Sequence, residues 1–194
     1  TLHYGASISR DVVTPVTNGE RFTKDTNGFA LGWTWVLGER DLLDVSASLM
    51  LQSGYLDDPY KVAPVGTIDD NVTVPERRPD SRQRVALFAK YGHYFLWNGA
   101  VKASYRYYRD DWSVEAHTLD VTYDQKLGSR WIVSPRVRLY TQTGASFYAS
   151  LFPVPETYRS ADSRLSPLRS LLGGLTGAYR VNDAPWVNLA GTWQ

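Results

Sequence analysis

A two-residue alternation of apolar and polar side chains runs through most of this chain of 194 residues. In residues 43–51 every odd position is apolar and most even positions are polar, and residues 101–107, 119–124 and 137–142 repeat the pattern. Successive side chains of a β-strand point to opposite faces, so this period predicts strands with one apolar and one polar face. Helical periodicity is almost absent. We therefore expect an all-β fold.

Strands are expected to alternate with tight turns and long connections. The predicted strands cover residues 2–9, 28–37, 42–54, 82–95, 100–109, 116–126, 131–143, 170–181 and 186–193. Tight turns rich in Gly, Asn, Asp and Pro are expected at 38–41, 96–99, 127–130 and 182–185. Long surface loops are expected at 10–27, 55–81 and 144–169, with a short connection at 110–115. No linker divides the chain, so residues 1–194 are expected to form a single domain.

Strand length favours a membrane barrel over a soluble sandwich. Strands in soluble sheets usually run about 5 or 6 residues, whereas several of those predicted here reach the length of a tilted strand that crosses a bilayer. Alternating short turns and long loops are typical of outer-membrane barrels, and such a sheet must close because lipid cannot satisfy an open edge. We therefore predict an antiparallel transmembrane β-barrel of the outer-membrane type, with a soluble β fold as the alternative.

The aromatic residues favour the same interpretation. Six of them lie close to the expected tight turns: Trp35, Phe95, Trp97, Tyr123, Trp131 and Trp186. Five others lie toward the opposite strand ends: Tyr55, Tyr105, Tyr107, Trp112 and Phe147. Aliphatic residues fill the middle, as in a barrel with two aromatic girdles around an aliphatic band. Aromatic residues are also common in strands generally.

Three stretches of the sequence resemble a known bacterial family. They are Gly54-Tyr55-Leu56-Asp57-Asp58-Pro59-Tyr60-Lys61-Val62, Arg78-Pro79-Asp80-Ser81-Arg82 and Ser104-Tyr105-Arg106-Tyr107-Tyr108-Arg109-Asp110-Asp111-Trp112. Their order and spacing, within about residues 28–148, are similar to those of DUF3570, a domain of unknown function predicted to form outer-membrane barrels. The resemblance implies the outer membrane of a Gram-negative bacterium, a cleaved signal peptide and a chain longer than this one. It implies no catalytic residue.

The chain is expected to be a portion of a larger barrel. It begins inside a predicted strand, without an initiator Met. Bacterial single-chain barrels normally have an even number of strands, whereas nine are predicted from this sequence. The final residues, Thr192-Trp193-Gln194, also lack the terminal aromatic that such barrels typically present. Missing strands would explain both departures.

The polar faces of the central strands carry most of the charge. If the apolar odd positions face lipid, the even positions place Lys102, Arg106, Asp120, Arg136 and Arg138 in the lumen, alongside Arg84, Lys90, Asp124 and Asp44. Folding the turn at 127–130 brings Asp120 opposite Arg138 or Arg136, and folding the connection at 110–115 brings Lys102 near Asp120 or Thr122. We expect a cross-strand ladder of ion pairs with a basic surplus. The ladder predicts either a pore that favours anions or a self-paired network that stiffens the lumen.

The loop after residue 54 combines acidic and aromatic side chains, namely Tyr55, Asp57, Asp58 and Tyr60. With Asp69 and Asp70, its carboxylates would offer oxygen ligands to Ca²⁺, but no EF-hand spacing is present, and a solvated turn set by Asp and Pro is the favoured interpretation. Tyr55, Tyr60 and Trp112 would stack on a sugar or form part of the outer aromatic belt. The latter is favoured.

Other motifs exclude several function classes. Lys and Arg total 21 against 20 Asp and Glu, so the strong basic excess typical of a nucleic-acid binder is missing. The chain has no cysteine, and its histidines, His3, His93 and His117, lack a metal-ligand spacing. No nucleophile elbow or nucleotide-binding glycine motif is present. We expect no metal, no cofactor and no catalytic residue.

The predicted function is a non-enzymatic outer-membrane channel, or a scaffold that holds periplasmic or lipoprotein subunits. Outer-membrane lipid is the expected partner, and no nucleic acid is expected. Two alternatives stay open: a surface enzyme whose site lies in the long loops, and a soluble secreted β protein that binds glycans through its aromatic residues.

Overall fold

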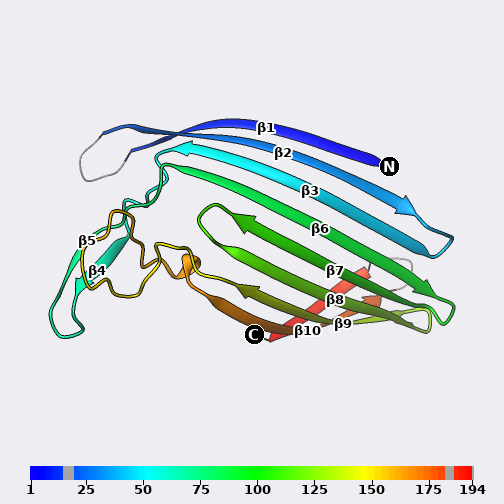
Figure 1. Cartoon of the computed structure of the whole chain (residues 1–194). Helices are drawn as coiled ribbons and strands as arrows, with labels where there is room; N and C mark the ends of the chain where they lie inside the picture. Colours follow the sequence, from blue (N-terminus) through cyan, green and yellow to red (C-terminus); the bar gives the residue numbers. More distant parts are fainter. Residues whose placement is uncertain (15–19, 182–185, 194) are drawn as a thin grey trace.

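The computed structural model describes residues 1–14, 20–181 and 186–193, and its main feature is one antiparallel sheet of nine strands (Figure 1). Strands adjacent in this sheet are also consecutive in the chain, except that a separate hairpin is inserted between β3 and β6. The strands are β1 (Leu2–Val13), β2 (Phe22–Val36), β3 (Asp41–Gly54), β6 (Ser81–Phe95), β7 (Gly99–Asp110), β8 (Glu115–Leu127), β9 (Trp131–Gln142), β10 (Leu168–Arg180) and β11 (Trp186–Trp193). The predicted all-β antiparallel class is confirmed.

The sheet curves into a trough (Figure 1). β1 and β11 form its two edges, and no pairing joins these edges among the described residues. The described sheet is therefore open, and closure into a barrel stays a prediction.

The turns after β2, β6 and β8 lie at one end of the sheet, and the long connections lie at the other end together with the short β7–β8 turn (Figure 1). Two of the tight turns contain a residue in the left-handed region, Asn98 with φ 60° and Gly128 with φ 62°, where Gly and Asn are the most tolerant residues. The predicted turns after β2, β6 and β8 are confirmed. The turn expected at 182–185 lies outside the described residues.

Two of the three predicted loops are more ordered than expected. The loop at 10–27 is wrong in its bounds, because β1 and β2 continue pairing as far as Val13 and Phe22. An ion pair supports this extended pairing: Nε of Arg10 donates to Asp25, its register partner on β2, at 2.6 Å. The loop at 55–81 contains a hairpin of its own, β4 (Val62–Gly66) with β5 (Asn71–Pro75). The loop at 144–169 contains one 3-10 turn, Ser163–Leu165.

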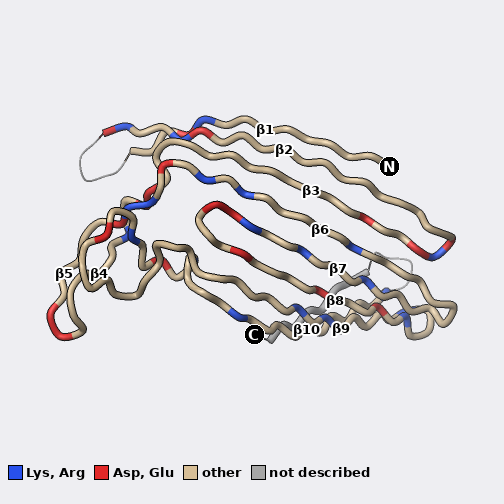
Figure 2. The backbone as a smooth tube through the Cα atoms, viewed as in Figure 1, with Lys and Arg blue, Asp and Glu red and all other residues tan. Residues whose placement is uncertain are grey.

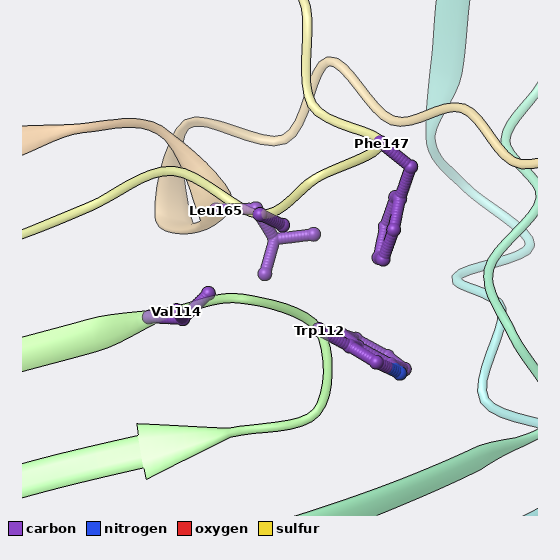
Figure 3. Packing of buried hydrophobic residues seen from close by; sticks show 5 residues of the cluster. Trp112, Val114, Phe147 and Leu165 are labelled. Atoms are coloured by element: carbon purple, nitrogen blue, oxygen red, sulfur yellow. The ribbon is translucent and has the colours of Figure 1, made fainter.

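Two small hydrophobic cores lie at the end of the sheet that carries the long connections. In the first, Trp112 from the β7–β8 turn packs edge-on against Phe147 with ring centroids 5.1 Å apart, beside Val114 and Leu165 (Figure 3). The second joins Ala63 and Val65 of the hairpin to Phe152. The placement of Trp112 and Phe147 in an outer aromatic belt is thus wrong: they are only 3% and 6% exposed, because both chain segments fold inward over the strand ends.

The two faces of the sheet differ in chemistry. Away from the strand ends, most odd-numbered side chains of β2, β3 and β6 to β10 are apolar and form an outer face with a high exposed fraction, for example 58% at Leu31, 48% at Leu87 and 62% at Leu171. Adjacent strands keep these positions on the same face, since Leu31 and Leu87 both pair in register with Ala47. None of the described residues forms an apolar helix long enough to span a membrane.

Candidate functional site

An open hollow with a volume of about 550 Å³ lies on the inner face of the sheet. Its charged lining comes from even-numbered positions of β6 to β9: Lys90, Lys102, Asp120, Asp124, Arg136 and Arg138. A second hollow of about 460 Å³ adjoins it, because Phe88, Ser104, Asp120 and Arg138 line both. The second hollow adds Arg106 from β7.

Strand register explains why these charges gather. Asp120 on β8 pairs with Arg138 on β9, and Lys102 on β7 pairs with Thr122 on β8. Residues paired in register point to the same face of an antiparallel sheet. The central parts of β1, β2 and β3 contain no charged residue, and Figure 2 shows this contrast with β6 to β9.

Asp120 holds two guanidinium groups at once. Nη2 of Arg136 donates to its Oδ2 at 2.5 Å and Nε of Arg136 donates to Oδ1 at 3.0 Å. Nε of Arg138 donates to Oδ2 at 2.6 Å. The carboxylate is 12% exposed, whereas the side chains of Arg136 and Arg138 are 42% and 45% exposed. The predicted neighbours of Asp120 are therefore both present.

Lys102 lies opposite one of its two predicted neighbours, and its ion pair is with a carboxylate that was not among them. Its register partner is Thr122, as expected, but Nζ donates to Oδ2 of Asp124 at 2.6 Å instead of to Asp120. Long side chains reach diagonal neighbours across a strand pair, and Asp120 is already occupied by two arginines.

Positive charge exceeds negative charge in the two hollows. Their lining contains five cationic side chains, adding Lys90 and Arg106 to the three already paired, against the carboxylates of Asp120 and Asp124. Within the described part of the chain, neither Lys90 nor Arg106 forms an ion pair. The hollows are thus basic and only partly self-neutralised.

A second polar cluster lies at the loop end of the sheet, around Asp110. This buried carboxylate accepts hydrogen bonds from Nε of Arg82 at 2.9 Å and from the hydroxyl of Tyr108 at 2.8 Å. Its other oxygen accepts the backbone N–H groups of Trp112 and Val114. The Arg82 guanidinium also lies 4.1 Å from the centre of the Trp112 ring. Asp110 thereby fixes the β7–β8 turn against β6.

The neighbouring cluster joins the two long loops. Nη2 of Arg78 donates to Asp162 at 3.0 Å, and Arg78 also pairs with Glu76, whose carboxylate accepts the hydroxyl of Ser160. Burial favours a raised pKa at Asp162, but hydrogen bonds from Arg164 and the charges of Arg164 and Lys61 outweigh it and lower the pKa to about 2. For Asp57, burial prevails over the hydrogen bond from the Arg78 backbone and raises the pKa.

Comparison with known proteins identifies the family. The model of the family described as "Protein of unknown function (DUF3570)" matches residues 1–189. The chain belongs to the DUF3570 family. This match extends well beyond residues 28–148, which contain the three stretches that resemble the family. Neither the curated proteins nor the solved structures give a match.

The three stretches that resemble DUF3570 meet in space. Asp57 of the first accepts a hydrogen bond from the backbone N–H of Arg78 in the second at 2.5 Å. Arg82 of the second contacts Asp110 and Trp112 of the third. In this DUF3570 chain the motif residues therefore build the loop-end clusters, while the charges of β8 and β9 lie outside those stretches.

The predicted surface-loop residues divide into two groups. Tyr60 is 72% exposed, as expected for a solvated turn. Asp57, Asp58 and Tyr55 are partly buried instead: Asp58 pairs with Arg164 at 3.2 Å, and the Tyr55 ring stacks on Phe22 at 4.5 Å. Because Trp112 is buried, it offers no platform for a sugar.

Metal-ligating side chains do not converge among the described residues, where no group of three or more His, Asp or Glu is placed to hold an ion. His93 lies 2.6 Å from Asp41, and His117 lies 2.6 Å from the Tyr105 hydroxyl. His3 lies 3.0 Å from the Thr34 hydroxyl. All three are thus engaged in local cross-strand contacts.

Sequence reasoning missed the Glu76, Ser160 and Asp162 cluster. Glu76 and Ser160 are 84 residues apart, as are Arg78 and Asp162, so no local periodicity relates them. The available signal was the charge density of the two long loops, with Arg77 and Arg78 in one and Asp162 and Arg164 in the other.

Proposed function

We propose that this DUF3570 chain forms the wall of an outer-membrane β-barrel whose lumen passes small anions. The observation that carries the proposal is the chemical contrast between the two faces of the sheet: the outer face exposes leucines and valines, and the inner face contains a basic hollow. An apolar band facing lipid and a polar interior are the features of transmembrane barrels. Large exposed apolar surfaces are rare on soluble monomers.

Aromatic contacts near the tight turns support the membrane assignment. Phe95 and Trp97 stack at 4.4 Å, and Trp131 packs on Tyr179 at 4.6 Å. Trp97 and Trp131 are 61% and 47% exposed. Amphipathic rings of this kind favour the boundary between lipid and water. The aliphatic outer face next to them would then lie in the hydrocarbon core.

Single-channel recording tests the proposal. Full-length protein purified in detergent is added to a planar bilayer under a KCl gradient, and the reversal potential is measured. We expect stable conductance steps with a preference for chloride, because the surplus positive charge of the lumen raises the local anion concentration. Recovery of the protein in the aqueous phase without detergent would contradict the membrane assignment and favour a soluble glycan-binding protein.

The self-paired part of the ladder favours a second candidate function. Asp120 and Asp124 are occupied by cations of the same sheet, and such pairs would stiffen a lumen that does not conduct. A barrel of this kind would serve as a scaffold for periplasmic or lipoprotein subunits. The scaffold function predicts that the protein inserts into a bilayer without conducting. It also predicts that such subunits co-purify with it from gently solubilised membranes.

A further inference from the structure

The arginines of the inner hollow retain hydrogen-bond donors after their ion pairs are formed. Arg138 uses only Nε on Asp120, so its two terminal nitrogens have no partner among the described residues. Arg136 uses Nε and Nη2, which leaves Nη1 without a partner in the same part of the chain. A guanidinium offers five donors in a rigid plane. The Asp120 carboxylate therefore orients the guanidinium groups of Arg136 and Arg138, and their remaining N–H donors can bind a ligand in the hollow.

Guanidinium groups fixed in this way bind carboxylate and phosphate groups better than spherical anions such as chloride. Their parallel N–H groups match the two oxygens of a carboxylate or phosphate, and such charge-assisted pairs are stronger than neutral hydrogen bonds. Arg138 is 45% exposed and lines both hollows, so an anion in either one reaches it. Lys90, which has no ion pair in the described structure, adds an exposed cation to the first hollow.

The remaining lining indicates what the anion is attached to. Ser104, Thr122 and Thr176 bring hydroxyl groups to the first hollow. Phe88 gives an apolar surface to both hollows. Hydroxyl groups beside an apolar ring complement a small polyhydroxylated molecule, which has both C–H faces and O–H edges. A volume of about 550 Å³ accommodates a solute of monosaccharide size.

We infer that the hollow around Arg136 and Arg138 is a binding site for an oxygen anion carried by a small polyhydroxylated solute, of the sugar-acid or sugar-phosphate class. The inference rests on the proposed channel function, and it names the class of solute that the channel would pass. The solute anion engages the spare donors of Arg138 and Arg136, while its hydroxyl groups contact Ser104 and Thr122. Asp120 positions the arginines and does not contact the anion.

Competition with chloride current tests the inference. Full-length protein in a planar bilayer carries chloride while D-gluconate, acetate or D-glucose is added. We expect gluconate to reduce the current with saturation, glucose to have no effect, and acetate to be weaker by about tenfold because it lacks the hydroxyl groups. Equal potency of acetate and gluconate would overturn the polyhydroxylated part. Absence of block by gluconate and by D-glucose 6-phosphate alike would overturn the whole inference.

Repeating the titration with D-glucose 6-phosphate and with inorganic phosphate shows whether the site prefers a sugar phosphate or a sugar acid. Tighter block by glucose 6-phosphate than by either gluconate or inorganic phosphate assigns the phosphate class, and the reverse order against gluconate assigns the acid class. Inorganic phosphate matching glucose 6-phosphate would again overturn the polyhydroxylated part.

Two variants separate geometry from charge. Arg138→Lys keeps the positive charge but loses the planar donors, so gluconate affinity is expected to fall about tenfold, with a smaller change in ion selectivity than in Arg138→Gln. Arg130→Gln removes an exposed cation outside both hollows and serves as the matched control. Equal gluconate affinity in wild type and Arg138→Lys would contradict the recognition by paired donors.

Calorimetric titration of gluconate, and separately of D-glucose 6-phosphate, into the detergent-purified protein measures binding without relying on conduction. Binding without conductance would retain the site and reject the channel. Conductance without binding would retain the channel and reject the site.

Discussion

Asp120 lies opposite Arg138 in register, yet it makes its two-pronged contact with Arg136, which lies two residues before Arg138 on β9. Arg138 contributes only its Nε. One carboxylate therefore restrains two arginines that belong to successive rungs of the inner face. This relationship makes Asp120 the point where a single substitution changes both the charge and the order of the hollow.

Neutralising this carboxylate is expected to increase anion preference. Asp120→Asn removes one of the two negative charges in the hollows and releases both arginines, so the reversal potential under a KCl gradient should shift further toward that of chloride. The free energy of unfolding should fall by about 1 kcal/mol or less, because the arginines are half exposed. Asp69→Asn, on the exposed hairpin turn, is the control. An unchanged reversal potential in Asp120→Asn would contradict a conducting hollow.

The loop-end cluster around Asp110 is expected to be far more sensitive. Asp110→Ala leaves Arg82 buried without its partner and frees the N–H groups of Trp112 and Val114. Breaking a buried ion pair from one side costs about 3–5 kcal/mol, which should appear as a lower denaturant midpoint in detergent. Asp111→Ala is the matched control, since Asp111 is exposed and accepts only the N–H of Gln83. Equal midpoints for the two variants would show that the cluster is not structural.

Much of the sheet was predictable because alternation and turn chemistry are local. The predicted strand from Trp131 begins at the correct residue, and the turn at 127–130 limits the residue opposite Asp120 to Arg138 or Arg136, of which the structure shows Arg138. The inward folding of Trp112 was not predictable, because its partner Phe147 is 35 positions away and belongs to a loop without periodicity. The diagonal pair of Lys102 with Asp124 depends on side-chain direction, which the two-residue period does not specify.

Removing the aromatic anchor of the inserted hairpin should loosen that hairpin alone. Phe152 is 3% exposed and packs on Ala63 and Val65, so Phe152→Ala is expected to cost about 3 kcal/mol locally. Trypsin cleavage after Arg77 and Arg159 should accelerate, because these residues pair with each other beside the hairpin. Val154→Ala, at a position 62% exposed, should cleave like wild type. Unchanged cleavage of Phe152→Ala would place the stability of the hairpin elsewhere.

Acid should release the junction between the long loops. Folding lowers the pKa of Asp162 from 3.8 to about 2, so its contribution is complete above pH ~4 and is lost as the pH falls toward 2. The shift corresponds to about 2 kcal/mol. Hydrogen exchange of residues 156–166 should therefore rise over this pH window once the intrinsic pH dependence is subtracted. Asp162→Asn should show fast exchange at neutral pH and no such rise, and a persistent rise in that variant would assign the transition to another group.

The central claim is that odd positions of β2, β3 and β6 to β10 face lipid and their even positions face a water-filled lumen. Probes at neighbouring residues test it most directly. These 194 residues contain no cysteine, so Leu119→Cys and Thr118→Cys each add a single label to this part of the protein. Leu119 lies on the outer face, and Thr118 lines the inner hollow. With full-length protein in bilayers, brominated lipid should quench a fluorophore at 119, and aqueous iodide should quench one at 118. Quenching of both by iodide, and of neither by brominated lipid, would contradict the account.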